Sequence, residues 1–227
     1  MSIDASSKAR NVSASSGNAT LVNSTSRSQD ERSEKMRARL LAASVEVMRE
    51  RGYAGFTTEM VAQTARVSRG ALLHHFPRKR DLILAVHKHL YQLAVNSSAE
   101  IACAATDQST IIDNMLKDAE NFFLGDQFFS VLSIVVSVST EPDIKAEILD
   151  ASRNARLAIE AAWVDRMREF MPRPLAEIIV YMTFNIVRGY AIRTLWEDDP
   201  ARYAEMIATW KSLMAVLLLR EGVDCTI

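Results

Sequence analysis

Residues 57–82, TTEMVAQTARVSRGALLHHFPRKRDL, carry side chains suited to binding a polyanion rather than to breaking bonds. Arg69 can donate a pair of parallel hydrogen bonds to guanine, and His74 can hydrogen-bond a base or a phosphate. Lys79 adds a mobile positive charge nearby in the sequence. The chemistry that these residues indicate is the recognition of double-stranded DNA.

Three further positions are expected at the starts of helices: the hydroxyls of Thr58 and Ser68, and the backbone amides near Gly70. Free N–H groups and the helix dipole favour a phosphate at such positions. We expect these groups to position the protein on the DNA backbone without reading the base sequence.

Two short helices joined by a tight turn would hold these groups in place. Thr57 suits the cap of the first helix, residues 65–68 interrupt that helix, and Ser68 suits the cap of the second. Pro77 ends the second helix, since proline lacks the N–H that a helix interior requires. This pattern predicts a helix-turn-helix, in which the second helix enters a major groove.

The segment from about Leu40 to Leu82 resembles the DNA-binding domain of the tetracycline-repressor (TetR) family of bacterial transcription regulators. The matching pieces, in chain order, are LLAASVEVMRERGY at 40–53, Thr57, Val61-Ala62, VSRGAL at 67–72, His75-Phe76, Lys79 and Leu82. Carried over position by position, the resemblance implies DNA contacts at Thr58, Ser68, Arg69, Gly70, Leu73, His74, His75 and Lys79.

Two positions depart from the family pattern. Arg66 stands in the turn where the family usually has Gly, and a residue with a side chain adopts positive φ only at some cost. Leu73 stands where the family favours Tyr, so it keeps only the apolar part of that contact with DNA.

Charge is divided unevenly along the chain. Residues 32–90 hold 12 Lys or Arg against 5 Asp or Glu, whereas residues 91–227 hold 12 against 20, and the whole chain has a formal charge of −1. A basic block on an otherwise acidic chain is typical of a protein in which one domain binds phosphates. A solvated charged face is the alternative interpretation.

The expected fold class is all-α, with an N-terminal three-helix helix-turn-helix DNA-binding domain plus a C-terminal helical ligand-binding and dimerisation domain. Residues 1–28 are rich in Ser, Asn, Thr and Ala, which predicts a disordered N-terminal arm. The DNA-binding domain is expected over 29–78 and the effector-binding and dimerisation domain over 79–227. The arm is either inert or contacts a minor groove through Lys8, Arg10 and Arg27.

Hydrophobic periodicity of three to four residues predicts the individual helices. The first begins at Ser28 or Ser33 and ends near Gly52, which suits a helix C-cap. After the helix-turn-helix, the expected helices are 79–104, 113–124, 128–138, 141–170, 175–196 and 203–217. The segment 128–138 also has strand propensity, but a lone strand has no partner in an all-helical chain.

The resemblance implies that the last two helices pair with their equivalents in a second subunit, forming a four-helix bundle. A purely intrachain core is the alternative. The interface residues expected on this basis are Ile178, Met182, Gly189, Met206, Trp210, Leu213 and Leu217.

Pockets between the helices of a bundle are natural binding sites for small molecules. We expect an apolar or amphipathic effector, with Arg188 able to favour an anionic one. Each candidate lining residue could instead belong to a plain core; the candidates are Met115, Phe122, Phe123, Phe128, Trp163, Met167 and Phe184.

The sequence has no catalytic motif, and no cofactor is expected. His74 and His75 point about 100° apart on a helix, so a metal site is not expected.

Cys103 and Cys225 are expected as free thiols, with a disulfide as the alternative. No run of eighteen apolar residues and no secretion signal is present, so we expect a cytoplasmic protein without a membrane span.

The expected function is that of a DNA-binding transcriptional regulator and repressor, which binds a palindromic operator as a homodimer and is released by a small-molecule effector. Two rival hypotheses are a helical ligand carrier or enzyme with a vestigial helix-turn-helix, and a protein-binding adaptor.

Overall fold

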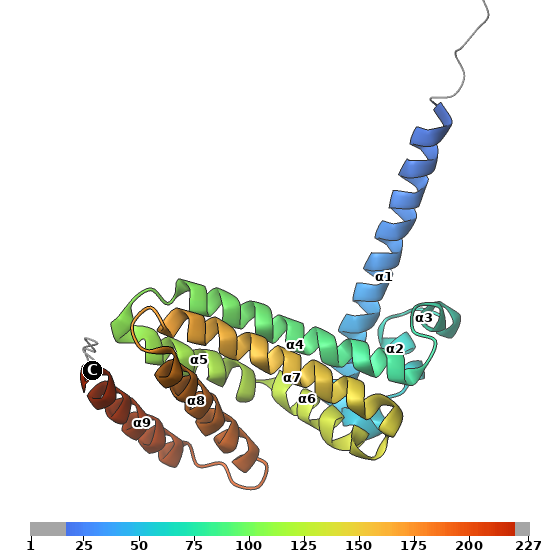
Figure 1. Ribbon diagram of the computed structural model, residues 1–227. Coiled ribbons are helices and arrows are strands. Elements are labelled where there is room, and N and C mark those ends of the chain that lie inside the picture. The colour runs from blue at the N-terminus through green and yellow to red at the C-terminus, as the bar shows by residue number, and fades with distance from the viewer. Residues whose placement is uncertain (1–16, 221–227) are drawn as a thin grey trace, which may run out of the picture.

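A computed structural model describes the backbone of residues 17–220 and the side chains of residues 29–220, and this described part contains helices and no strand. Figure 1 shows the helix-turn-helix at one end of an elongated bundle, with α8 and α9 at the other. The α-helices are α1 Gly17–Gly55, α2 Thr58–Thr64, α3 Arg69–His75, α4 Lys79–Ala104, α5 Ile111–Phe123, α6 Asp126–Ser137, α7 Pro142–Met167, α8 Arg173–Arg193 and α9 Pro200–Arg220. Short 3₁₀ turns precede α5 at Gln108–Thr110 and α7 at Val138–Thr140. The all-α expectation is confirmed.

The start of α1 differs from the expectation. The helix begins at Gly17, so residues 17–28 are helical rather than a disordered arm, and Ser28 and Ser33 are not its start. Extending an existing helix costs far less than nucleating one, and no proline interrupts the chain between Gly17 and Gly52. Lys8 and Arg10, and the side chain of Arg27, lie outside the described residues.

Gly52 ends the regular part of α1, as its sequence position indicated. Its φ of +61° and ψ of −174° are non-helical, and the chain kinks there before a last turn to Gly55. Glycine adopts this conformation without the steric cost of a Cβ. The kink turns the chain into α2.

Both helices of the helix-turn-helix are capped by the residues that the sequence indicated. The Thr57 hydroxyl accepts a hydrogen bond from the Met60 amide at 3.2 Å, and the Ser68 hydroxyl accepts one from the Ala71 amide at 3.1 Å. Each cap satisfies an N–H that would otherwise lack a partner at a helix start. α3 ends at His75, two residues before Pro77.

The N-terminal core is not confined to residues 29–78. It includes Leu40 of α1, Val61 of α2 and Leu72 of α3. Further buried members come from α4, α6 and α7: Leu82, Ile83, Val86, Leu90, Val131, Ile134, Ile144 and Ile148. The helix-turn-helix is therefore packed directly on the helices of the C-terminal part.

A second core fills the space between α4, α5, α7, α8 and α9. Trp163 of α7 is fully buried at its centre, and the second half of α4 contributes Ala94 and Ala102. Thus α4 belongs to the N-terminal core along its first half and to the C-terminal core along its second. The predicted bounds of α4 match those observed, and residues 128–138 lie in a helix and 3₁₀ turn rather than a strand.

Among the described helices, α8 alone is long and apolar enough to cross a membrane. The number of candidate spans rises to two if the bent pair of α5 and α6 is counted as one span. Core helices of soluble proteins pass the same test. The side of α8 that carries Val180 and Val187 is buried in the C-terminal core, while Ile178 and Met182 are exposed on another side. This is the pattern of a core helix with one uncovered apolar face.

Arg66 adopts φ of +52°, the left-handed conformation that its place in the α2–α3 turn indicated. It is the one non-glycine residue with positive φ among the described residues. Its amide donates to the Gln63 carbonyl at 2.9 Å, so the turn holds it there despite the steric cost.

Replacing Arg66 with glycine is expected to raise the free energy of unfolding by about 0.5–1 kcal/mol, since relief of steric strain exceeds the added entropy of the unfolded chain. Equilibrium unfolding in guanidinium chloride measures the change. Arg66→Ala is the matched control, because it removes the same charge but keeps the Cβ, and it should not stabilise the protein. A lower unfolding free energy for Arg66→Gly would contradict the assignment of strain.

Candidate nucleic-acid interface and ligand cavity

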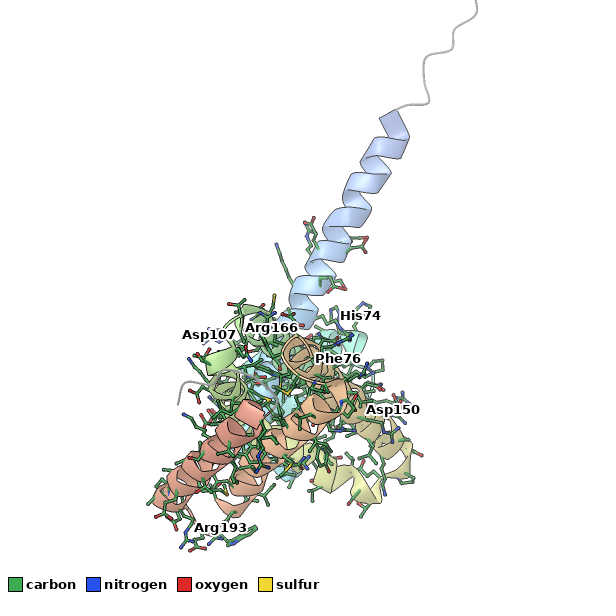
Figure 2. All side chains as sticks on the ribbon, turned by 60° about the vertical axis from the view of Figure 1, so that its left-hand side comes forward. His74, Phe76, Asp107, Asp150, Arg166 and Arg193 are labelled. Atoms are coloured by element: carbon green, nitrogen blue, oxygen red, sulfur yellow. The ribbon has the colours of Figure 1, made fainter. Side chains whose placement is uncertain are left out.

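One side of α3 is free of the rest of the chain. Arg69, Gly70 and His74 are exposed and Leu73 is half-buried, whereas Leu72 on the opposite side is fully buried. The residues of the outward side recur at one, three and four positions, so they form a continuous face of the helix. Figure 2 shows His74 near the base of α1, at the edge of the molecule.

The other predicted contact residues lie around this face. Ser68 is exposed at the start of α3, and His75 is half-buried, with its ring centroid 5.3 Å from that of His74. No group of three metal-binding side chains occurs in the searched part of the chain. Ser68, His74 and His75 thus lie together on or beside the exposed side of α3.

The start of α2 presents a second hydroxyl beside the one used in capping. Thr57 accepts the capping bond, whereas Thr58 is the first helical residue and is half-buried. Thr58 therefore lies at the start of α2, directly after the capping residue.

Lys79 is anchored by an aromatic ring that sequence reasoning did not single out. Its ammonium lies 5.2 Å from the ring centroid of Tyr53, within the range of a cation–π interaction. The Tyr53 hydroxyl donates to Glu141 at 2.5 Å, and its amide donates to the Ser133 hydroxyl at 3.3 Å. Burial and the Glu141 carboxylate raise the pKa of Tyr53 to about 12, so the ring stays neutral.

Part of the basic block is neutralised by nearby carboxylates. Arg78 pairs with Asp81 at 2.8 Å and holds the pKa of that carboxyl below its usual range, and Arg80 pairs with Glu147 at 2.6 Å. Arg69 forms no ion pair with a described side chain and is exposed. The charge of Arg69 therefore remains available to a polyanion at the exposed side of α3.

A cavity of about 1130 Å³ lies between α4, α5, α6, α7 and α8. Its wall includes four of the predicted effector residues: Phe122, Phe123, Phe128 and Phe184. Edge-to-face contacts join these rings, with centroids 5.1 Å apart for Phe123 and Phe128. Clustered phenylalanines near 122–128 were therefore an informative signal for the cavity.

Three predicted effector residues lie elsewhere. Met115, Trp163 and Met167 are fully buried and do not line the cavity, because their helix faces point into the C-terminal core. The Trp163 indole donates to the Asp118 carboxylate at 2.7 Å and to the Ser98 hydroxyl at 3.2 Å. It supports two residues of the cavity wall from behind.

Asp118 is a buried carboxyl in the cavity wall that sequence reasoning missed. It accepts hydrogen bonds from Ser98 at 2.5 Å and from Trp163. Burial raises its pKa, while these two hydrogen bonds act in the opposite direction. An acidic residue on an apolar helix face, as in DNMLKDAENFF, was the available signal.

A polar group lies near the boundary between the two cores. Tyr91 and Ser152 line the cavity, and the Ser152 hydroxyl is 3.0 Å from Nε2 of fully buried His87. The Nδ1 atom of His87 has no hydrogen-bond partner among the described residues. Burial lowers the pKa of His87 to about 4, with Lys88 adding to the effect, so the imidazole is neutral.

The cavity wall also carries arginines. Arg156 is paired with Glu160 at 2.7 Å, and Arg188 donates to Asn185. Arg188, which the sequence suggested as an effector contact, is among the residues that line the cavity.

An uncovered apolar face runs along α8 and α9. Four of the predicted interface residues are exposed on it: Ile178 at 56%, Met182 at 44%, Met206 at 36% and Leu213 at 57%. A Cβ built on Gly189 would meet nothing within 4 Å in this chain. Exposed residues that the prediction omitted are Tyr181, Val216 and Leu219.

Trp210 and Leu217 were predicted to lie in the dimer interface, but they are less exposed than the other residues of that set. Trp210 is 5% exposed, and its indole donates to the Thr183 hydroxyl at 3.1 Å. Leu217 is half-buried against the C-terminal core. α9 is apolar over more than one face, so periodicity alone did not separate the inner residues from the outer ones.

Of the two predicted thiols, Cys103 is exposed and free. Cys225 lies outside the described residues.

The family model for bacterial regulatory proteins of the tetR family matches residues 40–86. The chain is 36% identical over 178 residues to the HTH-type transcriptional regulator CymR of Pseudomonas putida, covering 78% of this chain and 88% of the relative. It is 29% identical over 165 residues to the HTH-type transcriptional repressor AcnR of Corynebacterium efficiens, covering 69% and 80%.

Solved structures share the fold. A transcriptional regulator from Rhodococcus sp. RHA1 has a TM-score of 0.61 and 20% identity, covering 84% of this chain and 98% of the other. A candidate transcriptional regulator from Saccharomonospora viridis, in complex with choline, has a TM-score of 0.63 and 16% identity, covering 80% and 96%. With the capped α2–α3 pair and the relative at 36% identity, these similarities show that the chain belongs to the tetR family of bacterial regulatory proteins and is a DNA-binding transcriptional regulator, not an enzyme.

Proposed function

We propose that this regulator is a cytoplasmic repressor that binds a palindromic operator as a homodimer and leaves it when a small apolar or amphipathic molecule fills the cavity. The observation that carries the proposal is the exposed face of α3, continued by Lys79 at the start of α4. The relative named as a transcriptional repressor supports repression over activation.

Within this proposal, some residues around α3 contact bases and others contact phosphates. Arg69 and His74 read base edges, since they project from the outward face of a helix that is free to enter a major groove. Thr58, Ser68, Gly70, His75 and Lys79 bind phosphates, and Leu73 makes an apolar contact.

Dimerisation would follow from the uncovered face of α8 and α9. Exposed apolar side chains as large as Ile178 and Leu213 favour cover by a second subunit. A two-fold axis through this face presents two copies of α3 to half-sites about one helical turn apart.

Release by a ligand would pass through α4. This helix begins at the proposed phosphate contact of Lys79 and carries Tyr91 and Ala94 in the cavity wall, roughly 20 Å further along at 1.5 Å per residue. A ligand that favours a different position of α4 changes the spacing of the two recognition helices. Its effect cannot exceed its difference in affinity for the two positions.

The double variant Arg69→Ala, Lys79→Ala is expected to weaken operator binding by roughly 30-fold or more, because a base contact and a phosphate contact are lost together. Fluorescence anisotropy at fixed salt measures the change. Lys117→Ala, Arg168→Ala removes the same charge from α5 and the end of α7 and should bind as the wild type does. Unchanged affinity in the α3–α4 variant would show that the DNA site is misassigned.

Phe184→Ala is expected to raise the ligand concentration that releases half of the DNA by about tenfold, since one aromatic contact with the ligand is lost. The ligand would first be found by a thermal-shift screen against the wild-type protein. DNA affinity without ligand should stay within about twofold, as the cavity is remote from α3. Phe170→Ala is the control, because Phe170 is also half-buried but lies outside the cavity. Equal effects of the two substitutions would argue against this cavity.

Leu213→Glu is expected to raise the dimer dissociation constant by roughly 100-fold or more, because an unpaired carboxylate in an interface costs several kcal/mol. Analytical ultracentrifugation measures the shift toward monomer. Val136→Glu, at a position 62% exposed on α6, should leave the assembly unchanged. A dimer that tolerates Leu213→Glu would place the interface elsewhere.

A further inference from the structure

The N-terminal part of α1 extends well beyond the region that the fold requires. Residues 29–35 and 37–39 are exposed, Met36 is half-buried, and Leu40 is the first fully buried residue of the helix. Figures 1 and 2 show this part of α1 projecting from the end of the molecule that carries α2 and α3. Burial against the core therefore does not account for its length.

Charge is sorted around this exposed segment. At 3.6 residues per turn, Arg32, Lys35 and Arg39 lie within about 60° of one another, whereas Asp30 and Glu34 lie on the opposite side. Glu31 lies at the edge of the basic face, about 40° from Lys35, but forms no ion pair within 4.0 Å with a described side chain. The spacing of Arg32, Lys35 and Arg39 places like charges three and four positions apart, which destabilises a helix by a few tenths of a kcal/mol per pair.

The three cations of this basic face are free of carboxylate partners. Among the described side chains, none of Arg32, Lys35 and Arg39 forms an ion pair within 4.0 Å, although ion pairs at three- and four-residue spacing are common elsewhere in the chain. All three are exposed. They present charge to an outside partner.

Contacts with the helix-turn-helix place this face beside the recognition surface. The Arg39 guanidinium lies 3.5 Å from the Arg66 carbonyl in the α2–α3 turn, and Arg66 is itself exposed. On another side of α1, the Arg37 guanidinium lies 4.6 Å from the ring centroid of Phe76, directly after α3. α1 is thus held against both the turn and the end of α3.

We propose that the Arg32, Lys35 and Arg39 face of α1 binds phosphates of operator DNA that flank the bases read by α3. Arg32 and Arg39 are seven residues apart, which is about 10 Å along the helix axis. Successive phosphates of one strand advance about 3.4 Å along the duplex, so this length matches about three phosphate steps, enough for each of the three cations to contact a phosphate. The contact rests on DNA binding by α3 and adds affinity without base specificity.

The test uses the full-length protein and two duplexes that contain a site selected by the wild type from random-sequence DNA. The long duplex has ten additional base pairs on each side, and the short duplex ends at the selected site. Arg32→Gln, Lys35→Gln, Arg39→Gln should weaken binding to the long duplex and lower the steepness of its salt dependence by roughly 2–3 per subunit, at about 0.9 per phosphate contact. On the short duplex, the variant and the wild type should bind more nearly alike.

A control variant separates contact from general electrostatics. Lys117→Gln, Arg168→Gln, Arg193→Gln changes the net charge by the same amount on α5, after α7 and at the end of α8, and Figure 2 shows Arg193 far from His74. This control should retain the wild-type salt dependence. The proposal is overturned if the α1 variant keeps the wild-type salt dependence, if the control loses as much, or if the loss is equal on both duplexes. Failure of wild-type DNA binding would instead overturn the function of α3.

Discussion

Helix α4 is buried in both hydrophobic cores, and this packing fixes the position of the DNA-binding helices relative to the cavity. Its first half packs with α1, α2 and α3, and its second half packs with the helices around Trp163. Since close-packed interiors resist small displacements, α3 cannot shift relative to the cavity unless α4 or its neighbours also move. Tyr53 of α1 also connects Lys79 at the start of α4 to Ser133 of α6 and to Glu141 just before α7. In the proposed function, this packing would connect the cavity to the DNA-binding surface.

Local signals in the sequence were sufficient to predict the helix-turn-helix. Thr57, Ser68 and Pro77 act within a few residues of their own positions, so capping and proline rules locate α2 and α3 without knowledge of the fold. The positive φ of Arg66 was indicated by the family resemblance, since the family usually has Gly at this position of the turn. The predicted start of α1 was wrong. The composition of residues 1–28 indicated disorder, whereas the helix extends back to Gly17.

Features that depend on tertiary packing were predicted less well. Trp163 and Trp210 have large apolar side chains on amphipathic helices, but whether each faces a cavity, the core or a second subunit depends on neighbours distant in sequence. Asp118, Tyr91 and His87 were missed for the same reason, since a polar residue on an apolar face gives no indication of its partners. Phe122, Phe123 and Phe128 line the cavity as predicted, and they also pack in or against the C-terminal core, so the cavity borders that core.

The claim that α4 couples the ligand cavity to the DNA surface is tested most directly by measuring ligand affinity with and without bound DNA. The affinity of a ligand found by thermal-shift screening would be measured by isothermal titration calorimetry, on the free protein and on the protein saturated with operator DNA. Thermodynamic linkage requires DNA to weaken ligand binding by the same factor by which the ligand weakens DNA binding, typically about 5- to 150-fold. Equal ligand affinity in the free and DNA-bound states would contradict the coupling.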